Sequence, residues 1–157
     1  MDYFAEVKPI IDLSVRELCH KPYKGHPKGC PNFNKRWSCP PKCKTIDKLL
    51  DLSKPDYAIY NIFDFKSHVN RMKEKHPNWT QRQLECCLYW QPRARKELKN
   101  KIKLFLQNHQ GYRISYVPEG QGVNITATMA NVGIQLEWPP ITKTFQIVLA
   151  GIPNKSE

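Results

Sequence analysis

Four cysteines lie close together near the start of the chain, at Cys19, Cys30, Cys39 and Cys43. The stretch that contains them is rich in Pro and Gly and shows no regular hydrophobic period, so it is predicted to have little core of its own. Cysteine thiolates bind Zn²⁺ tetrahedrally or hold iron and sulfide. We therefore interpret residues 19–43 as a metal-binding segment, with the four cysteines as candidate ligands.

The spacing of the cysteines helps to choose the cofactor. Successive cysteines are 11, 9 and 4 residues apart, whereas a structural zinc knuckle has two tight pairs with about two to four residues between ligands. Iron–sulfur sites accept more varied separations, and a Cys-Pro pair, as at Cys30 and Cys39, occurs in some cluster loops. A 4Fe–4S iron–sulfur cluster is the favoured cofactor. Zinc and reduced structural cysteines are the alternatives.

The same segment carries a resemblance to a known family. Arg16, Cys19, Gly-Cys-Pro-Asn-Phe at 29–33 and Trp-Ser-Cys-Pro-Pro at 37–41 resemble the signature of an uncharacterised family of predicted metal-binding proteins. Residues 122–133 are similar to that family's Gly-Ile-Asp-Val stretch, which ends in Asn-x-Gly. The family has no agreed activity, so the resemblance implies a metal and leaves the reaction open.

The resemblance implies Cys19, Cys30 and Cys39 as ligands, with Cys43 as an additional one. Here Cys19 lies further from Cys30 than in the family pattern. We expect Cys19 to be dispensable, which would leave one iron of a cubane open to substrate. His20 and His26 lie within the segment and could substitute as ligands, but we interpret each as a loop side chain.

The charge is strongly positive and uneven. The formal net charge is +11, and residues 66–113 hold 12 Lys or Arg against 3 acids. Such an excess favours a polyanion partner such as RNA or DNA, because each neutralised phosphate releases counterions. Within this region the Tyr89–Lys96 run also places aromatic rings beside guanidinium groups, although we expect Trp90 itself to pack in the core. The candidate phosphate contacts are Arg93, Arg95, Lys96, Lys99 and Lys103.

Three functions fit these observations. The first is a metal-dependent enzyme that uses an iron–sulfur cluster on a sulfur-bearing or nucleotide or nucleic-acid substrate, although neither a general base nor a nucleotide-binding loop is evident. The second is a non-catalytic nucleic-acid-binding module stapled by zinc. The third is a redox or structural partner protein.

The start of the sequence lacks the pattern of a secretory signal, and no apolar run reaches the roughly 18 residues of a membrane span. We therefore expect a cytoplasmic protein with reduced thiols.

We expect an α/β fold: a single compact domain over residues 1–157, with a small mixed sheet, several helices and the cysteine-rich loop segment 19–43 within it. Cys86 and Cys87 are interpreted as small buried side chains of a helix that begins at Thr80. The strands predicted from β-forming and apolar runs are residues 56–65, 113–117, 134–138 and 144–150. The other helices predicted from spacing and capping residues are residues 45–53, 66–76, 92–108 and 124–131.

Overall fold

The computed structural model describes residues 3–21, 29–30, 35 and 39–155. Its centre is a four-stranded sheet in the order β1-β2-β4-β3, built from β1 (Phe4–Val7), β2 (Asp56–Phe63), β3 (Arg113–Ser115) and β4 (Thr144–Gly151). Helices pack against this sheet, which confirms the α/β class. Every neighbouring pair of strands is antiparallel, so the expected mixed sheet is wrong. β4 lies between β2 and β3 and runs antiparallel to both, so β2 and β3 run in the same direction.

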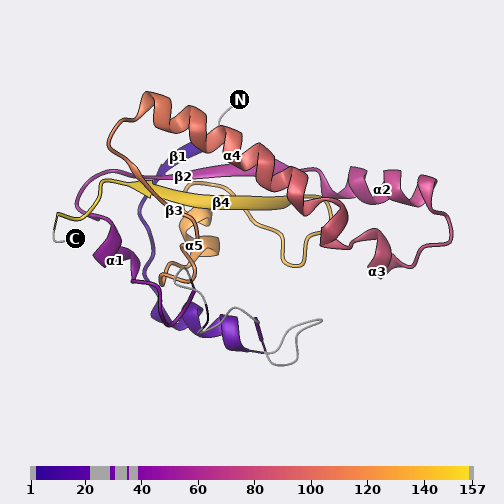
Figure 1. Ribbon diagram of the computed structural model, residues 1–157, viewed down its shortest axis with the longest axis horizontal. Helices are drawn as coiled ribbons and strands as arrows, with labels where there is room; N and C mark the ends of the chain where they lie inside the picture. Colours follow the sequence, from indigo (N-terminus) through magenta and orange to yellow (C-terminus); the bar gives the residue numbers. More distant parts are fainter. Residues whose placement is uncertain (1–2, 22–28, 31–34, 36–38, 156–157) are drawn as a thin grey trace.

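The helical elements divide between the two faces and one end of the sheet (Figure 1). The long α4 crosses one face, α1 and α5 lie on the other, and α2 and α3 extend beyond one end of the sheet. The elements are η1 (Leu13–His20), α1 (Ile46–Leu49), α2 (Phe65–Lys75), α3 (Gln81–Leu84), η2 (Cys87–Tyr89), α4 (Gln91–Asn108) and α5 (Ile125–Ala130). No helix in the described part of the chain is long and apolar enough to span a membrane.

Alternation along the central strands produces a core on each face of the sheet. On the α4 face, Ile59 and Val148 pack with Phe105, which has no exposed surface. On the opposite face, Tyr60 and Leu149 belong to a cluster with residues of α1, α5 and the loops between strands. α4 therefore covers one face of the sheet, and α1 and α5 cover the other.

Local capping chemistry explains several of the helix starts. The Thr80 hydroxyl accepts from the Gln83 amide while the Gln83 side chain accepts from the Thr80 amide, the reciprocal capping box expected from the sequence. The Asn124 side chain caps α5 by accepting from the Ala127 amide. Gly133 follows α5 with φ +81°, a left-handed conformation that favours glycine.

Other local predictions are wrong. The helix that begins at Thr80 ends at Leu84, so Cys87 lies in the separate η2 and is exposed rather than buried, while Cys86 is half-buried. Residues 134–138 form no strand, because Ile134 and Leu136 pack partly buried against the core cluster on the α5 face without pairing to the sheet. The apolar pattern of this stretch marked burial and not β-structure. Whether the whole chain is a single domain stays a prediction.

Candidate metal centre

Cys39 and Cys43 lie in one tight turn at the end of the cysteine segment. The Cys43 amide donates to the Cys39 carbonyl oxygen at 3.0 Å, which closes the turn. The Cys43 side chain is buried, and its thiol donates to the Gly120 carbonyl oxygen at 3.1 Å. Cys39 is half-buried. The turn therefore presents two sulfurs that are close in sequence, one inside the protein and one at its surface.

Arg16 is the charged partner of this turn. Its Nη2 donates to the carbonyl oxygens of Cys43 at 2.8 Å and Pro41 at 3.3 Å, and it lies 3.8 Å from the Cys43 sulfur. Its Nε is buried and has no hydrogen-bond partner within the part of the chain that the structure describes. A guanidinium with a donor to spare beside a buried thiol fits the negative charge that the sulfur takes on when it binds a metal.

The loop between β3 and α5 supports the cysteine turn. The Gly122 carbonyl oxygen accepts from the Asp12 amide at 2.7 Å, and the Gln121 carbonyl oxygen accepts from the Ile46 amide at 2.9 Å. Gly122 has φ +94°, and a Cβ there would lie 2.6 Å from a methyl of Leu13. Loop 118–124 thus joins the segments on both sides of the cysteines, and only glycine allows η1 to approach this closely.

Sequence reasoning did not single out Gly120 or assign a role to Arg16. A Cβ at Gly120 would approach the Pro40 ring to 3.2 Å, so its small size lets the cysteine turn pack against the loop. The Gly-Gln-Gly run at 120–122 is the sequence signal that could have indicated a close backbone approach.

The remaining candidate ligands are only partly covered. Cys30 is half-buried, and the backbone of Cys19 lies at the end of η1. The side chains of Cys19 and His20 lie outside the described residues, as do His26 and the signature residues at 31–33 and 37–38. Among the side chains that are described, no three His, Cys, Asp or Glu lie close enough to hold a metal ion. The ligand set proposed from the sequence therefore stays a prediction. In donor type, thiols beside a partly buried guanidinium, it suits a metal that prefers sulfur.

Comparison with protein families bears directly on this segment. Residues 11–109 match the sequence profile of the family described as "Predicted metal-binding protein (DUF2284)". The chain belongs to this family. The match covers η1, Arg16 and all four candidate cysteines, and it ends before loop 118–124. Comparison with curated proteins finds no match, and comparison with solved structures finds none either.

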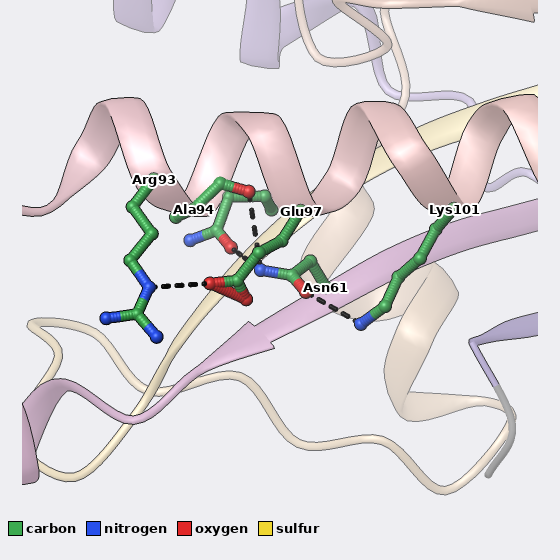
Figure 2. Close-up of polar contacts among 6 residues, drawn as sticks. Asn61, Arg93, Ala94, Glu97 and Lys101 are labelled. Atoms are coloured by element: carbon green, nitrogen blue, oxygen red, sulfur yellow. Dashed lines mark hydrogen bonds and ion pairs between the residues drawn. The ribbon is translucent and has the colours of Figure 1, made fainter.

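The basic residues of α4 in this DUF2284 member divide into two groups, and Figure 2 shows the group whose side chains have partners. Arg93 pairs with Glu97 at 3.4 Å, and Lys101 donates to Asn61 Oδ1 at 2.7 Å. Four other cations of α4 are exposed, and their side chains have no hydrogen bond or ion pair among the described residues: Arg95, Lys96, Lys99 and Lys103. Of the five candidate phosphate contacts, Arg93 is therefore the one whose charge is already compensated.

Trp90 packs as expected, at the start of α4. Its ring stacks on Phe63 with centroids 5.4 Å apart and meets Phe65 edge-on at 5.6 Å. Its indole N–H donates to the Glu85 carbonyl oxygen at 3.2 Å. Trp90 is half-buried: it packs against a small core cluster, and part of its side chain remains exposed.

Proposed function

We propose that this metal-binding protein holds an iron–sulfur cluster of the 4Fe–4S type, with Cys30, Cys39 and Cys43 as ligands. The observation that carries the proposal is the Cys43 sulfur, buried 3.8 Å from the Arg16 guanidinium. Burial shields a cluster from water, and a fixed cation offsets the charge of the thiolates. A bound cluster would supply electron transfer and, where an iron lacks a cysteine, a position for substrate.

Three residues of the protein, Arg16, Gly120 and Gly122, help to position the ligands of such a site. Arg16 holds the Cys39–Cys43 turn through two carbonyl oxygens. Gly120 and Gly122 allow loop 118–124 to close against the turn and against η1. Together these contacts position sulfur ligands that the local sequence, rich in Pro and Gly, could not hold by its own packing.

Anaerobic purification tests the proposal directly. We expect protein that carries iron and acid-labile sulfide, with broad absorption toward the blue end of the spectrum. Stoichiometric zinc without sulfide would replace the cluster with the zinc alternative. Protein that takes up no metal, even after anaerobic reconstitution with iron and sulfide, would contradict both.

A second function, nucleic-acid binding, is favoured by one specific observation. The exposed cations Arg95, Lys96, Lys99 and Lys103 lie on one helix and carry no compensating acid among the described residues. A row of cations of this kind suits contact with a phosphate backbone. This function does not exclude a cluster, and it is tested separately through its dependence on salt.

A further inference from the structure

β4 is only partly covered by its outer neighbour in the sheet, the short strand β3. β2 pairs with β4 from Ala150 to Thr144, whereas β3 pairs only with Leu149, Ala150 and Gly151 of β4. The stretch of β4 from Thr144 to Val148 therefore extends beyond β3. Two cavities lie at this stretch, and both include Gln146 and Ile147 in their walls.

The first cavity, of about 460 Å³, has four aromatic rings in its wall and reaches the cysteine turn. Cys39 and Pro40 line one part of it. Two of the aromatic side chains in its wall are largely exposed to solvent: Tyr116, with an exposed fraction of 66%, and Trp138, with 67%. The other two rings in its wall are Trp90 and Phe145. Flat walls of this kind are suited to stacking on a planar ring.

The second cavity, of about 410 Å³, has two cations in an otherwise uncharged wall. Arg95 and Lys99 line it, one helical turn apart on α4. It shares Tyr116, Gln146 and Ile147 with the first cavity, so the two adjoin. Each volume falls within the roughly 300–1,000 Å³ of small-molecule sites. A ligand that spans both would place a ring against the aromatic walls and an anion against the two cations.

The shared wall is rigidly supported. Asn61 is buried, and its Nδ2 donates to Gln146 Oε1 at 2.9 Å and to the Ala94 carbonyl oxygen at 3.4 Å. The Gln146 Nε2 donates in turn to Thr144 Oγ1 at 2.6 Å. Figure 2 shows Asn61 beneath α4, between Ala94 and Lys101. This network holds α4 against β2 and β4 where the two cavities meet.

The two acids in the first cavity differ in what they can do. Glu137 accepts hydrogen bonds from the backbone amides of Ile141 and Thr142, so its carboxylate is committed to the loop it closes. The Glu119 carboxylate has no hydrogen bond or ion pair among the described residues, although the backbone carbonyl oxygen of Glu119 accepts from the Gly122 amide at 3.1 Å. Its side chain is exposed at the cavity, yet partial desolvation by the surrounding protein raises the pKa of its carboxyl. Glu119 is therefore the acceptor available to a ligand's N–H groups.

We propose that the joined cavities bind a purine mononucleotide, with the base between the aromatic rings, its N–H donors toward Glu119, and the phosphate at Arg95 and Lys99. Guanine suits this arrangement best, because adjacent ring and exocyclic N–H groups can face one carboxylate. The proposal does not rest on the metal centre, although Cys39 places the site beside it. The ligand's shared chemistry is that of a base joined to a phosphate, whether it is a free nucleotide or part of an RNA strand.

Titration of the full-length protein, as purified, with 5′-GMP tests this site by calorimetry and by tryptophan fluorescence. We expect saturable binding that is at least about tenfold tighter than that of guanosine or of inorganic phosphate alone, because each lacks one half of the ligand. A short single-stranded RNA that binds more than tenfold more tightly than GMP would assign the nucleotide to a strand. Equal or weaker RNA binding would assign it to a free ligand.

Matched variants distinguish GMP binding at the proposed site from a non-specific effect of the protein's net charge. Arg95→Gln with Lys99→Gln should weaken GMP binding about tenfold or more, whereas Lys96→Gln with Lys103→Gln, the same change in charge on the same helix, should weaken it less than about twofold. Tyr116→Ala should also weaken binding, while Tyr89→Ala, an exposed ring outside both cavities, should not. Equal losses in the two double variants, or no saturable binding up to millimolar GMP, would overturn the proposal. The metal content of each sample is measured as well, so that a failure of the nucleotide proposal can be distinguished from a failure of the proposed iron–sulfur cluster.

Discussion

The guanidinium of Arg16 donates to the carbonyl oxygen of Cys43 at 2.8 Å and lies 3.8 Å from the sulfur of the same residue. The contact joins η1, near the start of the chain, to the turn that ends the cysteine segment. One side chain thus supports both the backbone and the charge of a candidate ligand. This makes Arg16 a positioning residue whose role can be measured without knowing the reaction.

Arg16→Gln should speed the loss of iron from the anaerobically purified protein when a chelator is added. The variant removes the positive charge beside Cys43 and the two hydrogen bonds to the turn. Arg16→Lys should give an intermediate rate, because lysine keeps the charge but lacks the planar set of donors. Arg82→Gln, at an exposed position in α3, is the control and should lose iron at the wild-type rate. Equal rates in all four proteins would remove Arg16 from the metal centre.

The four cysteines should not contribute equally to iron binding. We expect Cys30→Ala, Cys39→Ala and Cys43→Ala to lose iron and sulfide, and Cys19→Ala to retain them. Cys86→Ala, at a half-buried cysteine outside the segment, controls for removal of a thiol. The measurement is iron and sulfide per protein chain. Equal loss in all four segment variants would indicate a closed four-cysteine site and would favour electron transfer or a structural role over catalysis.

Asp56 should make the stability of the fold depend on pH. Its carboxyl is buried, one oxygen has no hydrogen-bond partner among the described residues, and burial followed by repulsion from Asp51 raises its pKa to about 6. The folded state binds this proton more tightly than the unfolded state does. The stability from Asp56 is therefore greatest below about pH 4 and is lost as the pH rises to about 6.

Replacing Asp56 by Asn should remove this dependence. At pH 7 the variant should be more stable than wild type by up to about 3 kcal/mol, and the difference should shrink toward zero near pH 4. Urea denaturation at a series of pH values measures it. Unfolding free energies that differ by the same amount at every pH would show that the buried carboxyl does not titrate in this range.

The exposed cations of α4 should determine how any nucleic-acid affinity responds to salt. Replacing Lys96, Lys99 and Lys103 by Gln should reduce the slope of log affinity against log salt by about two to three units if all three contact phosphates. Lys8, Lys48 and Lys54 are exposed and lie outside α4, so their triple Gln variant is the control for net charge. Identical slopes for the two triple variants would mean that α4 is not the phosphate-binding surface.

Phe105→Ala should destabilise the protein by about 3–5 kcal/mol, because the ring is fully buried between α4 and the sheet and its removal leaves a cavity. The neighbouring Leu104 is 47% exposed, so Leu104→Ala is expected to cost less than about 1 kcal/mol. Urea denaturation of the two variants measures the contrast. Similar losses for both would contradict the assignment of Phe105 to the core.

Features governed by near neighbours in the chain were predictable from the sequence. The apolar spacing that ends near Asn108 predicted α4, and Thr80 with Gln83 predicted a capping box, because both depend on contacts between residues three or four apart. The same local logic failed for residues 134–138, where burial by distant segments, and not strand pairing, accounts for the apolar pattern.

The sequence by itself also determined the chemistry available to this protein: a set of cysteines typical of a metal site, and a basic central region. Only the tertiary structure decided what surrounds them. Strand pairing between β2 and β4, and the approach of loop 118–124 to Cys43, join segments that are distant in the sequence. Such contacts depend on how whole surfaces pack, and no local period encodes them. For the same reason the Arg16 contact and the two joined cavities became visible only in the folded chain.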